Sequence, residues 1–340
     1  MATSEITLTH LDEPLFDGAN ATKRDLVDYL DAIADRILPG LRDRPLSVIR
    51  VRAGTEPFMQ KNLPQYAPSW IKTMTMWAAA SKREVRYALC EDRDTLIWFA
   101  NQRAVEYHVT LGTSEQLDHP SYVVLDIDPP EGEAFGKAAA AAGLVRQALA
   151  DAGLGGAVKT SGAKGLHIYV PVSDSTTAED AAAATRAIAA RAEKLDSSLA
   201  TTAFVKADRG GKVFLDATRA HGATVVAVYS PRARPDVPVS FPVTWDELAS
   251  VSPRDFTIRT AAAALKDRDP WSDALPAPQQ LPPELVEEGH AIPVARVQAM
   301  HEGKRRARAS RGSLRLAHHI SHSLQLATNA LSLSVSDYSG

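Results

Sequence analysis

The sequence predicts an α+β protein, because it holds both strand-like apolar runs and segments with a repeating apolar face. The clearest strand covers residues 122–128 and ends at Pro129 and Pro130, which cannot continue a hydrogen-bonded ladder. The clearest helix covers residues 22–37, where Leu and Ile recur at helical spacing. Thr22 is its expected N-cap.

The remaining elements are predicted in chain order. Two β-rich runs, residues 85–89 and 95–99, flank a polar segment and indicate a hairpin. Ala-rich stretches predict helices over residues 133–151 and 176–195. A capping box from Thr176 to Glu179 opens the second of these helices. Further strands are expected over residues 104–108, 166–170, 212–216 and 224–229, Gly40 is expected to end the first helix, and a short helix begins at Trp245.

Composition is ordinary for a soluble globular protein, with 45% hydrophobic and 23% charged residues in a chain of 340. No apolar run is long enough for a membrane span, and the first residues lack a leader pattern. Cys90 is the only cysteine, which excludes an internal disulfide and a cysteine-based zinc site. We expect a cytoplasmic, nucleoid-associated protein. Because the net charge is −3, any polyanion site has to be a local patch.

Three aspartates end apolar strands and predict a metal site. Asp126 and Asp128 lie on one face of their strand, about 7 Å apart, because side chains alternate along a strand. Asp216 ends a second strand and can complete a three-carboxylate set. Carboxylate oxygens are the ligands that Mg²⁺ and Mn²⁺ prefer. An acidic, solvated strand end is the other interpretation of the pair.

A glycine-containing loop at residues 161–167 predicts a phosphate cradle. Gly162 and Gly165 allow backbone amides to approach an anion closely. Ser161 offers a hydroxyl donor, Lys164 a point charge and His167 a ring donor. The loop is not a Walker A loop and is weak evidence alone. A carboxylate metal site beside such a loop is what nucleotidyl transfer requires.

Cations and aromatic rings alternate between residues 42 and 72, a mixture that suits phosphates and stacked bases. An ordinary surface with buried rings is the other interpretation. The residues concerned are Arg42, Arg44, Arg50, Arg52, Phe58, Lys61, Tyr66, Trp70 and Lys72. Other lysines and aromatic residues are expected to have no role in binding. We expect Lys159 and Lys206 to be surface charges, and Trp70, Trp77 and Trp98 to belong to the core.

Taken together, the motifs resemble a known family. Residues 125–130, 160–167 and 212–216 are similar to the three signature motifs of the polymerase domain of bacterial non-homologous end-joining ligases, within the archaeo-eukaryotic primase superfamily. Further similar segments are 22–29, 58–64, 67–71, 106–109 and 229–234, so the resemblance covers about residues 5–265 in motif order.

The resemblance implies a fold and a set of site residues. The family fold has two β-sheets with flanking helices and an active-site cleft between the sheets. Asp126, Asp128 and Asp216 would bind the metals, and His108 would lie near them as a further catalytic residue. The nucleotide would contact Ser161, Gly162, Lys164, Gly165, His167 and Arg232. DNA would contact Lys23, Arg50, Arg52, Phe58 and Lys61, with Lys23 at a downstream 5′-phosphate.

The implied function is template-directed nucleotidyl transfer in DNA repair. We expect extension of primer 3′-hydroxyl ends with NTPs or dNTPs, short-gap filling, ribonucleotide incorporation and two ions of Mn²⁺ or Mg²⁺. Expected partners are a primer–template or gapped duplex and Ku or a separate ligase, with no membrane. Two alternatives are a non-catalytic DNA-binding module of primase fold and a metal-dependent phosphoesterase.

The sequence also departs from the family pattern. Met59 stands where a second Phe is usual, and residues 217–220 replace the usual aromatic and Gln-Asn or Glu-Asn. Glu13 takes the place of an expected lysine, which predicts weaker discrimination for a 5′-phosphate. A ligase Lys-x-Asp-Gly motif is missing, so we expect a stand-alone polymerase.

We expect a catalytic domain over residues 1–290 and a basic tail, rich in Ser, His and Leu, over residues 291–340. Prolines after about residue 270 indicate a linker, so a chain ending near Arg268 is expected to stay folded. Three histidines of the tail are expected to be solvated rather than to bind a metal: His318, His319 and His322.

Overall fold

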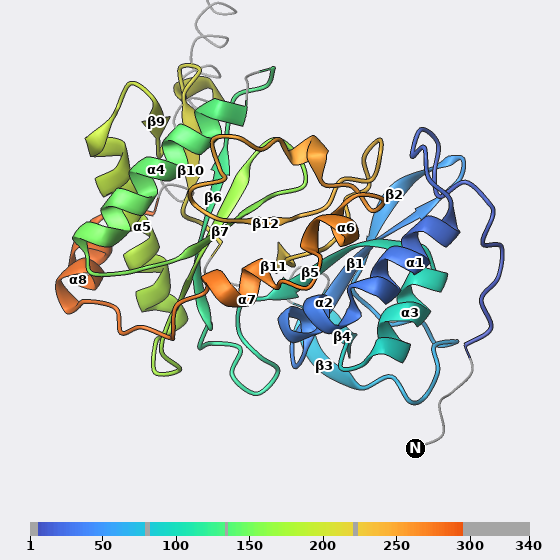
Figure 1. The fold of residues 1–340 in the computed structure, drawn as a ribbon. Helices are drawn as coiled ribbons and strands as arrows, with labels where there is room; N and C mark the ends of the chain where they lie inside the picture. Colours follow the sequence, from blue (N-terminus) through green and yellow to red (C-terminus); the bar gives the residue numbers. More distant parts are fainter. Residues whose placement is uncertain (1–5, 79–81, 133–134, 220–223, 295–340) are drawn as a thin grey trace, which may run out of the picture. The chain divides into compact units, whose positions relative to one another are not determined.

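The structure is a computed structural model that describes residues 6–78, 82–132, 135–219 and 224–294. Those up to Ile292 belong to one compact unit. Two six-stranded sheets form its framework, and helices flank them (Figure 1). The predicted α+β class with two sheets is therefore confirmed. The histidines at 318, 319 and 322 and nearly all of the expected tail lie outside the described residues, so the boundary at 290 stays a prediction.

The first sheet has the strand order β11-β5-β1-β4-β3, and β2 pairs with β1 off this path. It is antiparallel throughout. The strands are β1 (Pro45–Arg52), β2 (Thr55–Gln60), β3 (Thr73–Ala78), β4 (Arg83–Leu89), β5 (Ala104–Thr110) and β11 (Thr224–Val226).

The second sheet has the order β12-β7-β8-β6-β10-β9 and holds the predicted acidic strand near its centre. The strands are β6 (Tyr122–Asp128), β7 (Ala157–Thr160), β8 (Leu166–Pro171), β9 (Ala200–Thr201), β10 (Val213–Asp216) and β12 (Pro242–Val243). Strand β6 pairs antiparallel with both β8 and β10. Every residue of β7, β8 and β10 is buried, so this sheet forms much of the core.

Each sheet has its own helices. Figure 1 shows α1 to α3 beside the first sheet and α4, α5 and α8 beside the second. The α-helices are α1 (Lys23–Ala32), α2 (Ala34–Leu41), α3 (Arg93–Asn101), α4 (Phe135–Asp151), α5 (Ala178–Leu195), α6 (Ala261–Leu265), α7 (Pro270–Ala274) and α8 (Pro283–Ala291), and two 3-10 turns cover Lys206–Asp208 and Pro253–Asp255.

The predicted helix over residues 22–37 is two helices. Thr22 caps α1 as expected and forms a capping box with Asp25. The helix stops at Ile33, whose ψ of 10° turns the chain before α2 begins. Gly40 lies inside α2 and does not end it. The turn lets both short helices bury an apolar face, which one straight helix of this pattern cannot do equally well.

The predicted hairpin over residues 85–99 is wrong in its second half. Residues 93–101 form α3, and only β4 is a strand. The Asp92 side chain accepts a hydrogen bond from the Thr95 N–H at 2.8 Å, which is an N-cap contact. Leu96, Phe99 and Ala100 are buried at helical spacing, so capping and burial outweigh the β-preference of the segment.

Other boundaries differ less. Thr177, not Thr176, caps α5, because its hydroxyl accepts from the Asp180 N–H. Strand β11 ends at Val226 instead of Tyr229, and the segment from Trp245 is a series of turns and not a helix. Trp77 is 65% exposed, against the expectation of a core residue, whereas Trp98 is buried.

The segment after residue 270 is not a linker. The Trp271 ring packs edge-on against Tyr169 at 5.2 Å, and Leu285 is fully buried. Gly289 lies so close to the α5 backbone that an added Cβ would overlap the Ala183 carbonyl, far inside van der Waals contact distance. Pro270 begins helix α7 and Pro283 begins helix α8, a position where proline is favourable.

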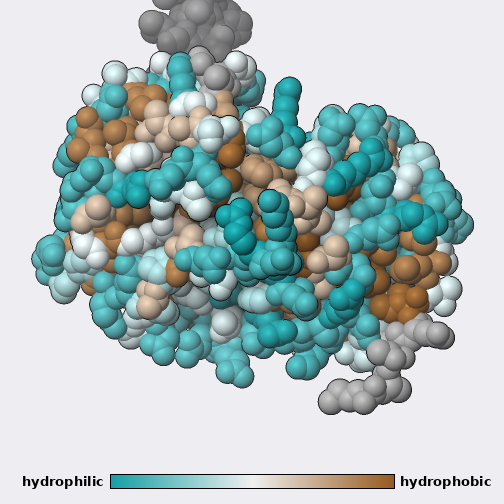
Figure 2. Space-filling model, viewed as in Figure 1, coloured by the Kyte–Doolittle hydropathy of each residue, from teal (hydrophilic) through white to brown (hydrophobic). Residues whose placement is uncertain are grey.

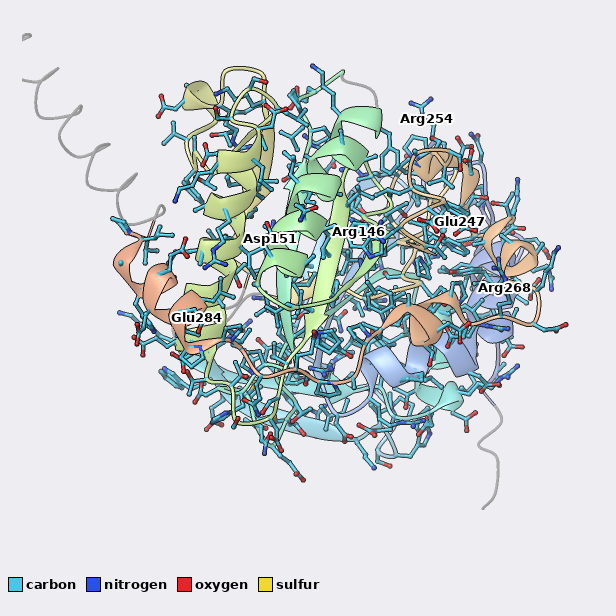
Figure 3. The ribbon with its side chains drawn as sticks, turned by 60° about the vertical axis from the view of Figure 1, so that its left-hand side comes forward. Arg146, Asp151, Glu247, Arg254, Arg268 and Glu284 are labelled. Atoms are coloured by element: carbon cyan, nitrogen blue, oxygen red, sulfur yellow. The ribbon has the colours of Figure 1, made fainter. Side chains whose placement is uncertain are left out.

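Much of the surface seen in Figure 2 is hydrophilic, with apolar residues in scattered patches. None of the described helices is long and apolar enough to span a membrane. Figure 3 shows Arg146 on α4, whose guanidinium lies over the Trp245 ring at 5.2 Å and fixes the turns that follow β12.

Candidate active site

The predicted carboxylates meet at the paired ends of β6 and β10. In the antiparallel register, Asp126 lies opposite Asp216, and Asp128 lies opposite Phe214. Asp126 and Asp216 are buried, whereas Asp128 is half-buried at the strand end. On the other side of β6, Asp126 lies opposite His167 of β8. The sheet therefore brings together side chains from three segments that lie far apart in the sequence.

Arg219 lies between two of these carboxylates. One terminal guanidinium nitrogen is 2.7 Å from Asp126 Oδ2 and 3.2 Å from Asp216 Oδ2. The other oxygen of Asp216 accepts hydrogen bonds from the backbone and the hydroxyl of Thr218. The sequence singled out this segment only as a departure from the family. The contact between Arg219 and the two carboxylates was therefore not predicted from the sequence.

The carboxylates differ in their protonation. Burial alone would raise the pKa of Asp126, but His167 and Arg219 hold that pKa well below its usual range. Burial and then Asp126 raise the pKa of Asp128. Burial and Lys159 lower the pKa of His167 to about 4, so this ring is neutral near pH 7. Asp126 is therefore ionised at neutral pH.

Lys159 is fully buried and is not the expected surface charge. Its Nζ lies 2.7 Å from His167 Nδ1 and 2.5 Å from the Ser240 hydroxyl. Burial lowers the pKa of Lys159 well below its usual value. By occupying Nδ1, Lys159 directs His167 Nε2 toward Asp126 Oδ1, 3.5 Å away. Lys206, in contrast, is exposed as predicted, and pairs with Glu131.

The predicted phosphate loop joins β7 to β8 beside the acidic strand. Ser161 Oγ accepts hydrogen bonds from the N–H groups of Ala163 and Gly165. Gly162 has a φ of +67°, which favours glycine. A Cβ on Gly165 would collide with the Ile127 carbonyl, so glycine allows the loop to lie against β6. Lys164 donates to the Pro129 carbonyl at 2.9 Å, next to Asp128.

A second cluster connects this loop to the first sheet. Glu106 Oε2 of β5 lies 2.8 Å from His108 Nε2 and 3.1 Å from Arg232 Nε. A terminal nitrogen of Arg232 donates to the Ser161 carbonyl at 2.6 Å. Burial alone would raise the pKa of Glu106, but His108, Arg232 and the Ala233 N–H lower it to about 2. Glu106, absent from the predicted site residues, is thus the group that holds His108 and Arg232.

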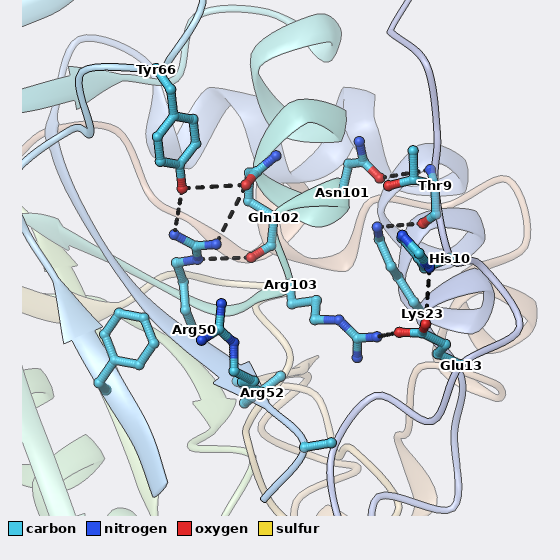
Figure 4. A pocket seen from close by; sticks show the side chains of 13 residues that line it. Thr9, His10, Glu13, Lys23, Arg50, Arg52, Tyr66, Asn101, Gln102 and Arg103 are labelled. Carbon is cyan, nitrogen blue, oxygen red and sulfur yellow. Dashed lines mark hydrogen bonds and ion pairs between the residues drawn. The ribbon is translucent and has the colours of Figure 1, made fainter. Parts of the chain in front are cut away.

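Four of the five predicted DNA contacts line one cavity of about 460 Å³ (Figure 4). They are Lys23, Arg50, Arg52 and Phe58, whereas Lys61 is exposed outside it. The Arg50 side chain donates to the Gln102 carbonyl, Gln60 and Tyr66, and it lies over the Phe58 ring. Phe58 is 47% exposed, as a base-stacking ring requires. Arg44, from the same cationic stretch, is instead buried and donates to the carbonyls of Thr110 and Leu111.

The cavity also contains Glu13, and its charge is compensated. Arg103 forms an ion pair with Glu13 Oε2, and His10 Nδ1 lies 2.9 Å from Glu13 Oε1 (Figure 4). Lys23 is almost fully buried and donates to the Thr9 carbonyl at 2.5 Å. Burial, and then Arg103, lower the pKa of Lys23. The sequence did not predict Arg103, which is far from Glu13 along the chain.

Comparison with known proteins identifies the family. Residues 22–271 match the family described as "LigD, primase-polymerase domain". The chain belongs to this family. Its membership confirms the resemblance drawn from the motifs and the expected class of enzyme, a DNA-directed nucleotidyltransferase.

Curated relatives of the family are longer proteins. The chain is 33% identical over 284 residues to the bifunctional non-homologous end joining protein LigD of Bacillus subtilis, covering 82% of this chain and 45% of the relative. It is 34% identical over 254 residues to the multifunctional non-homologous end joining DNA repair protein LigD of Mycobacterium tuberculosis H37Rv. This match covers 72% of this chain and 33% of the relative. The chain therefore spans less than half the length of these relatives.

A solved structure is also similar. It is the polymerase domain from Mycobacterium tuberculosis ligase D in complex with DNA, with a TM-score of 0.71 and 29% sequence identity. The match covers 80% of this chain and 99% of that one. The primase-type fold is thus shared across the domain, while the roles of the individual site residues stay predictions.

Proposed function

We propose that this chain is a template-directed nucleotidyltransferase that extends primer 3′-hydroxyl ends with NTPs or dNTPs and fills short gaps in DNA repair. The observation that carries the proposal is the meeting of three strand-end aspartates with the cationic loop 161–167, at the junction with the Glu106 cluster. A metal-binding carboxylate set beside a phosphate cradle fits nucleotidyl transfer better than hydrolysis, which needs a water-activating base.

The carboxylate set fits divalent ions. A guanidinium nitrogen already lies between Asp126 and Asp216, so the site is built to hold positive charge. Three carboxylates meet there beside one arginine, so the site can accept further positive charge in the form of divalent ions. As they stand, the described residues contain no group of three His, Cys, Asp or Glu side chains arranged as a metal site. We assign Asp126, Asp128 and Asp216 as ligands of two Mn²⁺ or Mg²⁺ ions, which when bound would activate the primer hydroxyl and neutralise the leaving pyrophosphate.

The cations around the loop are assigned to the triphosphate. Lys164 of the loop donates to the Pro129 carbonyl, and Arg232 donates to the Ser161 carbonyl. A phosphate oxygen can replace either carbonyl as the acceptor. Glu106 keeps the Arg232 guanidinium in place and orients His108 toward the same region. Ser161, the two loop glycines and His167 complete the proposed nucleotide contacts.

The match to a polymerase domain in complex with DNA supports a DNA substrate. We assign Arg50, Arg52, Phe58 and Lys61 to the template–primer duplex, and Lys23 to a downstream 5′-phosphate. Ribonucleotide incorporation, a preference for Mn²⁺, and Ku or a separate ligase as protein partners complete the proposal. The sugar preference, the metal preference and the protein partners follow from the family resemblance and not from a contact in the structure.

The proposal is tested by primer extension with Mn²⁺ on a gapped duplex. We expect Asp126→Ala and Asp128→Ala to lower extension by about three orders of magnitude, because several kcal/mol of charge stabilisation are lost. Duplex binding should change little, since contacts to the DNA backbone dominate affinity. Asp174→Ala, which alters an exposed aspartate outside the site, is the control. Undiminished extension by either variant would refute the metal assignment.

The same assay separates the alternatives. A wild-type protein that binds the duplex and never extends it would be a non-catalytic DNA-binding module. A protein that hydrolyses the nucleotide without extending the primer would be a metal-dependent phosphoesterase.

A further inference from the structure

Arg219 occupies the position between the two buried carboxylates of the site. It follows β10 by three residues, where the chain leaves the sheet. Thr218 binds Oδ1 of Asp216, which turns Oδ2 of this carboxylate toward Arg219. The guanidinium then contacts Oδ2 of both aspartates. The path of the chain after β10 directs the Arg219 side chain inward, toward the two carboxylates.

The oxygens that Arg219 contacts are those that a metal ion needs. Asp126 Oδ1 already faces His167, and Asp216 Oδ1 is bound by Thr218. This leaves Oδ2 of each aspartate as the oxygen open to a new ligand. A carboxylate oxygen bound to a guanidinium has lost part of its capacity to bind a divalent ion. Arg219 and a metal ion at these two oxygens therefore compete.

Arg219 can leave the site without opening the core. Its side chain is 35% exposed, whereas those of Asp126 and Asp216 are about 10% exposed. Its Nε lacks a hydrogen-bond partner, so the two carboxylates provide its main attachment. Rotation of a long, partly exposed side chain toward solvent costs far less than separating β6 from β10.

We propose that Arg219 is a tethered counter-cation that holds the carboxylates together before metal binds and is displaced by the incoming divalent ion. The inference rests on the proposed function in that Asp126 and Asp216 are taken as metal ligands. Its consequence is a metal affinity weaker than the carboxylates alone would give. In return, the metal-free site keeps a cation between Asp126 and Asp216, and β6 and β10 stay paired.

The test measures Mn²⁺ binding directly, from the loss of the electron paramagnetic resonance signal of free Mn²⁺, without nucleotide or DNA. We expect Arg219→Gln to bind Mn²⁺ at least about tenfold more tightly than the wild type, the factor that corresponds to about 1.4 kcal/mol of competing ion pairing. Arg219→Lys should lie between them, because it keeps the charge without the planar fork. The control is Arg259→Gln, which removes a similar ion pair, with Asp25, away from the site.

A thermal unfolding series covers the case in which Arg219→Gln folds poorly. Without metal this variant should melt several degrees below the wild type, and saturating Mn²⁺ should raise its Tm by more than it raises that of the wild type. Equal Mn²⁺ affinities for wild type and Arg219→Gln, with equal Tm shifts, would overturn the inference and leave the metal assignment intact. Failure of both proteins to bind Mn²⁺ would overturn the inference and the metal assignment together.

Discussion

At the scale of single residues, the buried pair of Lys159 and His167 links the site to stability. The folded-state pKa of His167 is about 4, against about 6.5 in an unfolded chain. Between these values the unfolded chain binds more protons, so stability falls as the pH falls from about 6.5 to about 4. Burial, and then repulsion from Lys159 and Arg232, disfavour a charged imidazole at this position.

We therefore predict that the wild-type protein loses about 2 kcal/mol more stability between pH 7 and pH 5 than His167→Gln does. Urea unfolding at the two pH values measures this difference. Glu106 and Asp126, whose pKa values are lowered, lose their contribution at lower pH. Asp128, whose pKa is raised, acts in the opposite direction in both proteins.

His290→Gln serves as the control, because it alters a histidine that is 42% exposed on α8. Its pH dependence should resemble that of the wild type. A wild-type slope as flat as that of His167→Gln would show that His167 is not buried as described.

The triphosphate cations give a second prediction at this scale. Lys164→Ala and Arg232→Ala should raise the KM for nucleotide and lower kcat, because these charges meet the charge that grows on the leaving group. Arg232→Ala should also cost about 1–3 kcal/mol of stability, since the buried carboxylate of Glu106 loses a partner. Steady-state kinetics and urea unfolding measure the two effects. Lys206→Ala, an exposed lysine paired with Glu131, is the control, and normal kinetics in both loop variants would place the nucleotide elsewhere.

The residues proposed for the site could largely be singled out from the sequence, whereas their immediate partners could not. Asp126 and Asp216 stand out because a carboxylate at the end of an apolar strand needs a partner, and the loop residues gain weight only beside them. Lys159 and Arg219 carry no such pattern. Their positions depend on a strand pairing or chain turn that brings them beside a residue distant in sequence, and a lysine or arginine is on average exposed.

At the scale of elements, the N-terminal segment and α1 form one wall of the cationic cavity. Glu13 and Arg103 neutralise each other there, so neither is free for a phosphate in the structure. We predict weak discrimination between gaps with a 5′-phosphate and gaps with a 5′-hydroxyl. Glu13→Lys should increase that discrimination several-fold, because it removes a carboxylate and releases Arg103. Binding to paired short-gap duplexes at low salt measures the ratio, since screening is strong beyond about 8 Å at physiological salt.

Glu284→Lys makes the same change of charge at an exposed position of α8 (Figure 3) and should leave the ratio unchanged. A strong 5′-phosphate preference in the unmodified protein would contradict the prediction. The other cations that line the cavity, Lys23, Arg50 and Arg52, would then be the groups to vary.

The type of an element was predicted correctly where one spacing of apolar residues dominates the segment. The prediction was wrong where helical and strand signals compete. Residues 122–125 and Ile127 are apolar or aromatic and rich in β-branched side chains, and residues 122–128 form β6 as predicted. Residues 95–99 combine β-preferring side chains with a helical spacing of buried positions, and the cap at Asp92 decides for α3. The stop at Ile33 is marked by no glycine or proline, so the sequence carries no signal for it.

At the scale of the whole molecule, the catalytic unit extends further than the motifs. A chain ending at residue 294 should keep the melting temperature and duplex binding of the full chain. A chain ending at Arg268 should lose several kcal/mol of stability, since burial of Trp271 and of Leu285 contributes about 1.5–3 kcal/mol each. Circular dichroism melts of the two shortened proteins measure the difference. Equal melting temperatures for both would show that α7 and α8 are dispensable.

The strand order of the second sheet has a consequence for synthesis on the ribosome. Strand β6 is made early, but its neighbour β10 follows almost a hundred residues later, and β7 pairs with β12 later still. Ser240, which binds Lys159, and Phe241, whose carbonyl accepts from the Thr160 N–H, also emerge late. A nascent chain therefore cannot assemble the site until about residue 243 has left the exit tunnel. Until then β6 lacks its β10 partner and presents an unpaired strand edge, so this protein is expected to engage chaperones that recognise unpaired apolar strands during its own translation.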